Sequence, residues 1–159
     1  MSKRVPPETV DPGLADELVG LIDRSLKDPH VEAVLARAGI PIGKKIEQQA
    51  NPALGIAYMG TKFQIDGKKE LGVDAIYFFA AKQKSYIRGS GDVEFAGYPG
   101  PLPLGLVLGE SRAAVTKKLG KPAKTYEDHD YWSPARNRRI ACTFASGKLV
   151  EVYIGRPRD

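Results

Sequence analysis

The stretch VDAIYF at Val73–Phe78 decides the fold, because its pattern returns as LVEVYI at Leu149–Ile154. Both stretches are rich in β-branched and aromatic residues, and each follows a glycine turn, DGK at Asp66–Lys68 and SGK at Ser146–Lys148. An apolar run after such a turn is typical of the second strand of an antiparallel hairpin. The sequence therefore predicts a similar hairpin in each half of the chain.

The residues that precede the two hairpins also correspond. In the first half Ala33-Val34 is followed by Gly39–Pro41, and in the second half Ala114-Val115 is followed by Gly120–Pro122. Glycine followed two residues later by proline ends a helix, because glycine adopts the C-terminal cap conformation and proline cannot continue the helix. A helix and then a hairpin, found twice, indicates an internal duplication whose matched positions carry packing and turn residues.

Three helices are predicted from apolar spacing and from capping residues. The first follows Asp11-Pro12, and its apolar stripe consists of Leu14, Leu18, Leu21, Ile22 and Leu26. The second begins at Asp28-Pro29, and its buried side consists of Val31, Val34, Leu35 and Ala38. The third runs from a Ser111 cap through Leu119.

The remaining apolar runs predict antiparallel meanders, so the fold class is α+β with short helices packed on sheet in one compact body. The expected strands are 54–59, 62–66 and 73–80 in the first half, with Gly60-Thr61 as a turn, and 104–108, 131–132, 138–145 and 148–154 in the second. The expected organisation is a flexible tail at 1–11, a first unit at 12–80, a connector at 81–104 and a second unit at 105–159.

The composition is that of an ordinary globular protein, with 42% hydrophobic and 27% charged residues. There is no apolar run of ~18 residues, so no membrane-spanning helix is expected. The basic N-terminus has no apolar segment behind it, and we therefore expect no secretory signal. The single cysteine, Cys142, cannot form an intramolecular disulfide and is expected to be a buried thiol, which favours the cytoplasm.

The second half resembles the SmpA/OmlA (BamE-like) family of small bacterial helix-plus-meander modules. The resemblance rests on Leu108–Val115, on Leu119–Pro122, on the tryptophan-containing strand and on the Gly-Lys hairpin. It covers residues 104–155 well and 28–80 loosely. A tandem pair of such modules is similar in architecture to the β-lactamase inhibitory proteins. The lipoprotein cysteine of BamE-like proteins and the disulfides of the inhibitory proteins are both missing, so the resemblance implies a fold and a broad surface for a protein partner.

The motifs that could carry chemistry are weak. Gly89–Glu94 has no third glycine of a dinucleotide fingerprint, and Gly39–Lys45 is one residue too short for a phosphate loop. Glu127–Asp130, with three carboxylates and a histidine, could bind a divalent metal or act in acid-base chemistry, but it is best interpreted as a solvated acidic loop. We therefore expect no enzyme, no cofactor and no metal site.

A net charge of +5 favours an acidic partner, which leaves nucleic acid as an alternative. Aromatic residues lie near arginines in one segment, which is the combination that holds single strands: Tyr131, Trp132, Arg136, Arg138 and Arg139. The neighbouring acidic loop at 127–130 would repel phosphate at that point.

A protein-binding surface is predicted from strand periodicity. If Ile76, Phe78, Val152 and Ile154 face the helices, Tyr77 and Tyr153 lie on the opposite face of the sheet. Tyrosines are enriched in binding hot spots. The alternative is that these rings cover one unit with the other inside a shared core.

The function that we expect is a protein-binding inhibitor, best described as a bacterial immunity protein that neutralises a toxin by stoichiometric occlusion. The expected partner-binding residues are Tyr77, Asp128, Asp130, Tyr131, Trp132, Arg136, Arg138, Arg139 and Tyr153. The alternatives are a basic nucleic-acid-binding accessory protein and an envelope-assembly module of BamE-like type.

Overall fold

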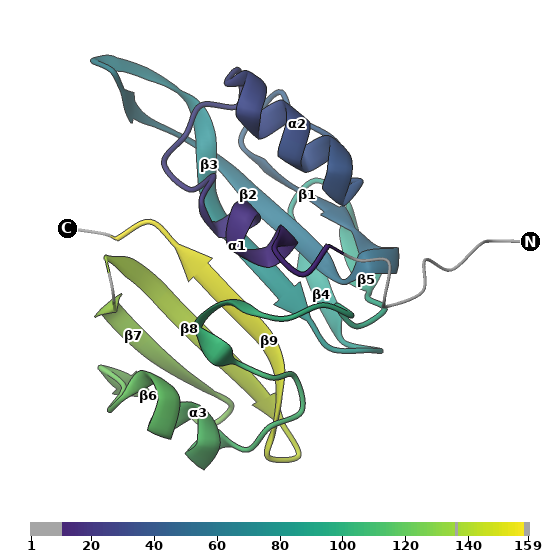
Figure 1. Cartoon of the computed structure of the whole chain (residues 1–159), viewed down its shortest axis with the longest axis vertical. Coiled ribbons are helices and arrows are strands. Elements are labelled where there is room, and N and C mark those ends of the chain that lie inside the picture. Colours follow the sequence, from purple (N-terminus) through teal and green to yellow (C-terminus); the bar gives the residue numbers. More distant parts are fainter. Residues whose placement is uncertain (1–10, 136, 158–159) are drawn as a thin grey trace, which may run out of the picture.

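The computed structural model describes residues 11–135 and 137–157. The expected tail at 1–11, apart from Asp11, lies outside the described residues, and so does Arg136. The helices are α1 (Leu14–Val19), α2 (Pro29–Ala38) and α3 (Arg112–Leu119), with short 3-10 turns η2 (Pro52–Leu54) and η3 (Pro103–Gly105) (Figure 1). The strands are β1 (Glu47–Asn51), β2 (Ile56–Ile65), β3 (Lys68–Phe79), β4 (Lys84–Ile87), β5 (Gly91–Glu94), β6 (Lys124–Thr125), β7 (His129–Ala135), β8 (Arg138–Ala145) and β9 (Lys148–Gly155).

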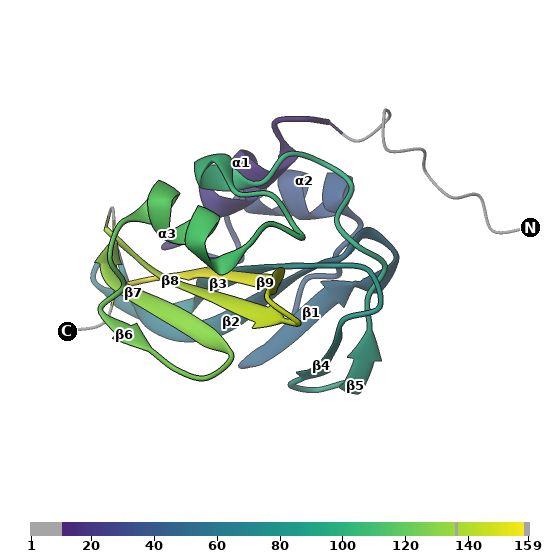
Figure 2. The ribbon, with the colours of Figure 1, turned by 90° about the horizontal axis from the view of Figure 1, so that it is seen from below.

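One main sheet carries the fold. Within the described residues it has seven strands in the order β1-β2-β3-β9-β8-β7-β6, and every neighbouring pair is antiparallel. The three helices lie on one side of this sheet, and the separate hairpin β4–β5 lies on the other (Figure 2). The predicted α+β class, with helices packed on antiparallel strands, is confirmed.

Two helices begin and end where their capping residues predict. Asp28 accepts a hydrogen bond from the backbone N–H of His30 at the start of α2, and Gly39 ends that helix with a φ of 69°. At the start of α3 the Ser111 hydroxyl accepts from the N–H of Ala114. These caps satisfy N–H groups that have no partner inside the helix.

The first helix is shorter than predicted, because the backbone after it pairs with a strand. The N–H of Asp23 donates to the carbonyl of Val73, and the N–H of Val73 donates to the carbonyl of Arg24. This pairing draws residues 23–26 alongside β3 and ends the helix at Val19. Leu21 remains buried, but from a turn and not from a helix.

Several strand predictions need correction. Gly60-Thr61 is not a turn, since β2 continues through it with a register shift between Met59 and Gly60. Residues 104–108 do not form a strand, because Leu104 has a left-handed φ of 63° in the turn η3. The expected connector at 81–104 contains the hairpin β4–β5, and β1 was not predicted. Strands β8 and β9 match their predictions to within one residue, β7 extends beyond the predicted 131–132, and β6 was not predicted.

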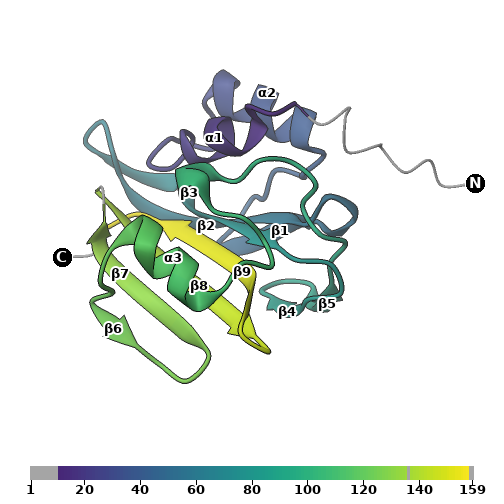
Figure 3. The same cartoon turned by 60° about the horizontal axis from the view of Figure 1, so that its bottom comes forward.

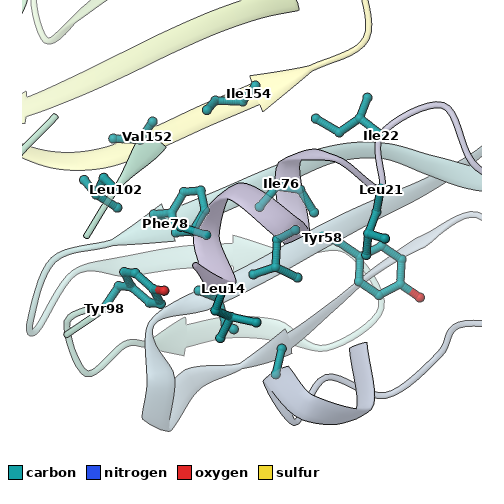
Figure 4. Close-up of a cluster of buried hydrophobic side chains, with 14 of the residues drawn as sticks. Leu14, Leu21, Ile22, Tyr58, Ile76, Phe78, Tyr98, Leu102, Val152 and Ile154 are labelled. Carbon is teal, nitrogen blue, oxygen red and sulfur yellow. The ribbon is translucent and has the colours of Figure 1, made fainter. Parts of the chain in front are cut away.

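The main core lies between the helices and the sheet and extends through both halves of the chain. Ile76 and Phe78 of β3 and Val152 and Ile154 of β9 are all buried in one cluster with apolar residues of the helices, which confirms that they face the helix side (Figure 4). In the second half, α3 lies over the β7–β9 part of the sheet and contributes Val115 to the same core (Figure 3).

Cys142 should be chemically silent in the folded protein. It is buried in the main core, and burial raises the pKa of its thiol to about 12. Because the thiolate is the reactive form, we expect a disulfide reagent at pH 8 to label Cys142 only after denaturant is added. Thiol absorbance assays with and without urea measure this. Rapid labelling of the native protein would contradict the buried position.

Candidate functional site

The face of the main sheet opposite the helices carries a row of side chains that runs across four strands. In register, Tyr77 of β3 lies opposite Tyr153 of β9, Tyr153 opposite Ala141 of β8, and Ala141 opposite Tyr131 of β7. Residues directly opposite in an antiparallel pair project from the same face. We call these four residues the central row, and all four are partly exposed. The prediction that Tyr77 and Tyr153 lie on the face away from the helices is confirmed.

Stacked rings support the central row from one side. The Phe95 and Phe79 rings stack with centroids 3.7 Å apart, Phe79 stacks on Tyr77 at 6.2 Å, and Tyr77 meets Tyr153 at 5.3 Å. Beyond Tyr153, the Arg139 guanidinium lies 5.4 Å from the ring centroid. Neighbouring rings held in this way lose little additional rotamer freedom when a partner binds.

The hairpin β4–β5 covers one end of this face. Ile87 and Phe95 pack on Ala57 and Phe79 in a second, smaller core, in which Ala57 is 0% exposed. The hairpin is also tied to the edge strand, because the N–H of Gln48 donates to the carbonyl of Arg88. The hairpin therefore buries Ala57 and Phe79 in the first half of the chain, whereas Ala141, Tyr153 and Tyr131 in the second half are partly exposed. In Figure 2 the hairpin and β6–β7 lie at opposite ends of this face.

Charged and polar groups beside the central row are partly desolvated. Burial raises the pKa of the Glu151 carboxyl, against a hydrogen bond from Gln83 that lowers it. Burial also raises the pKa of the Tyr77 hydroxyl, and the nearby Tyr153 and Glu151 add to this effect. A carboxyl held in such surroundings costs the fold stability at neutral pH, which is a frequent property of functional sites.

A loop at residues 126–129, which we call the rim loop, borders the same face. The Tyr126 ring stacks on His129 at 4.4 Å, and His129 Nδ1 lies 2.7 Å from Asp128 Oδ1. Register places His129 opposite Thr143, which in turn lies opposite Glu151. The rim loop thus brings an exposed tyrosine and a carboxylate to the border of the open face.

Arg112 of α3 holds the rim loop in place. Its guanidinium donates to both oxygens of Asp130 at 2.7 and 3.0 Å and to the carbonyls of Tyr126, Glu127 and His129. This bidentate ion pair lowers the pKa of the Asp130 carboxyl, which is 2% exposed. One side chain therefore fixes the loop to the helix side of the sheet.

Two of the expected partner-binding residues are not at the surface. Trp132 is 3% exposed, and its indole Nε1 donates to the carbonyl of Gly120. Asp130 forms an ion pair with Arg112, and its side chain projects from the same side of β7 as Trp132 does. Because neighbouring residues of a strand point to opposite faces, the outward position of Tyr131 places both Asp130 and Trp132 on the helix side. They are corrected here from contact residues to supporting residues.

The charged residues among the other expected ones do not lie together. Asp128 is exposed in the rim loop. Arg138 lies away from the open face, where it pairs with Asp23 at 3.0 Å. Arg139 is largely buried beside Tyr153, and its Nη2 has no hydrogen-bond partner among the described residues but lies 3.9 Å from Asp74. Arg136 lies outside the described residues.

Two residues that shape the face, Ala141 and Glu151, were missed from the sequence, and His129 was assigned only to the acidic loop. Ala141 and Glu151 alternate with core residues in the predicted strands, so the same periodicity that placed Tyr153 could have placed them. The clamp made by Arg112 had no signal of this kind, since it joins a helix to a loop through backbone carbonyls.

Comparisons with protein-family models, with curated proteins and with solved structures find no match to the chain. In the described residues no helix combines the length and the apolar character that crossing a membrane requires. The same residues contain no group of three or more histidine, cysteine, aspartate or glutamate side chains placed to hold a metal ion.

Removing the Arg112 clamp should destabilise the fold. Arg112→Ala leaves the buried Asp130 carboxylate unpaired, and we expect a loss of about 3–5 kcal/mol in the free energy of unfolding. The matched control is Arg37→Ala, which removes an ion pair with Glu17 whose two side chains are 50% and 37% exposed and should cost at most about 1 kcal/mol. Urea denaturation measures both. Equal losses would show that the clamp contributes no more than a surface ion pair.

Glu151 should make the protein less stable as the pH rises. Its pKa is raised in the folded state, so the folded protein binds this proton more tightly than the unfolded chain does. Stability contributed by the protonated carboxyl is therefore lost as pH rises from about 4.3 through the folded pKa. Glu151→Gln should flatten this part of the profile and be at least as stable at pH 7. Thermal unfolding between pH 4 and 8 tests this, and an unchanged slope would contradict it.

Proposed function

We propose that the chain binds another protein through the open face of the sheet and inhibits it stoichiometrically, as a bacterial immunity protein neutralises a toxin. The observation that carries the proposal is the central row, in which three partly exposed tyrosines stand on a preorganised face. Tyrosine is among the residue types that dominate binding energy at protein interfaces. We propose that this binding takes place in the cytoplasm and involves no catalysis, as the sequence also favours.

The register at the centre of the sheet supports an internal duplication. Ile76 lies opposite Ile154 and Phe78 opposite Val152, with Tyr77 and Tyr153 between them. A twofold axis that passes between Tyr77 and Tyr153 and exchanges the two halves of the chain would produce this register. A tandem pair of BamE-like modules with a continuous sheet therefore remains our interpretation of the chain, and it gives the open face its breadth.

The mixed charge of the open face suits a protein surface better than a polyanion. Two arginines near the face already have anionic neighbours, since Arg112 pairs with Asp130 and Arg139 lies near Asp74. The rim loop adds the exposed carboxylate of Asp128. Nucleic-acid binding, the alternative that the net charge favours, would need unpaired cations along a groove.

Truncating the central tyrosine should weaken the partner complex without unfolding the protein. The partner is to be isolated from the source organism with the tagged chain, and its 1:1 complex measured by calorimetry. We expect Tyr153→Ala to raise Kd about tenfold or more, as for a hot-spot residue. The matched control is Tyr86→Ala, because Tyr86 is 68% exposed on β4 and lies outside the central row.

Two results would overturn this function. One is an unchanged Kd for Tyr153→Ala in a protein that remains folded by circular dichroism. The other is salt-dependent binding of mixed oligonucleotides that competes with the protein partner, since affinity lost steeply with salt indicates phosphate contacts.

A further inference from the structure

Two alanines occupy matching places on the open face. Ala57 of β2 lies opposite Tyr77, and Ala141 of β8 lies opposite Tyr153. Each alanine is therefore the small residue next to one of the two central tyrosines, on the strand that flanks β3 or β9. The difference between them is cover, since Ala57 is 0% exposed whereas Ala141 is partly exposed.

The cover over Ala57 is a β-hairpin that the chain supplies itself. Ile87 of β4 and Phe95, directly after β5, place their side chains against Ala57 and Phe79. The hairpin forms a separate two-stranded sheet. Side-chain packing and a few backbone hydrogen bonds hold it against the main sheet. The first half of the face thus shows what kind of element fits over a small residue beside a central tyrosine.

The charges along the central row indicate which charged side chain a segment bound over the second half of the face should carry. The row continues outward from Tyr131 to Lys124, an exposed cation on the edge strand β6. Among the described ion pairs none involves Lys124. An acidic side chain is therefore the complementary charge at this end of the row.

We propose that the partner inserts a β-hairpin over Ala141, between Tyr131 and Tyr153. An apolar side chain of this segment packs on Ala141, as Phe95 packs on the first half, and a carboxylate next to it pairs with Lys124. This inference rests on the proposed function and names the occupant of the same face. The partner segment would contact the face through side chains and would not add a strand there, because β8 is already paired with β7 and β9 on both sides.

Hairpin peptides provide a probe that does not require the natural partner. A display library of disulfide-closed β-hairpins is selected against the full chain, and the enriched peptides are titrated against variants. We expect Ala141→Arg to weaken binding about tenfold or more, because the long arginine side chain would occupy the space in which the partner's apolar side chain packs on Ala141. Ala113→Arg is the matched control, since Ala113 is exposed on α3. Amide resonance shifts on peptide addition should concentrate in β7, β8 and β9.

A second variant tests the same proposal if Ala141→Arg fails to fold. Lys124→Glu changes an exposed residue at the end of the row and should weaken the peptides that carry a carboxylate next to the apolar residue. No enriched peptide, resonance shifts elsewhere, or affinities that neither variant changes would overturn the proposed occupant. Self-association of the chain that Ala141→Arg abolishes would also overturn it, because the face would then belong to a second copy.

The two proposals can fail separately. If Tyr153→Ala weakens the partner complex while hairpin peptides ignore Ala141, the face binds a protein but not through a hairpin. If Tyr153→Ala leaves the partner complex unchanged, the proposed function fails whatever the peptides do.

Discussion

Pairing of β3 with β9 at the centre of the main sheet is the constraint on which the other features depend. It joins residues 75–79 to residues 151–155, so that strands from the two ends of the chain lie side by side. The pairing removes two edges that would otherwise be open to other chains. It also places Ile76, Phe78, Val152 and Ile154 under the helices as one apolar layer, which makes a single core from both halves.

The same pairing determines what the other face can be. Because side chains alternate along a strand, burying Ile76 and Ile154 forces Tyr77 and Tyr153 outward and brings them into contact. Glu151 is carried to the same face, where burial works against its charge. A sheet that only had to be stable would place a neutral side chain there. Retaining a partly desolvated carboxyl beside exposed rings is the kind of stability cost that functional surfaces accept.

Features specified by neighbouring residues were predictable from the sequence, and features specified by distant pairing were not. Asp28 and Ser111 cap their helices through side chains two or three residues away, and strands β8 and β9 are defined by one tight turn. The early end of α1, in contrast, depends on pairing with Val73 far along the chain. At the site, alternation alone separates Tyr131 from Trp132, whereas the role of Arg112 depends on a tertiary contact between α3 and the rim loop.

The unequal cover of the open face follows from one difference between the halves. Two residues after the central tyrosine stands Phe79 in β3 and Gly155 in β9. An exposed Phe79 would leave a large apolar ring in water, and hairpin β4–β5 buries it to 0% exposure. Gly155 has no side chain to bury, and the Tyr153 ring already lies against it. The second half therefore needs no hairpin for its stability, and Ala141 remains partly exposed.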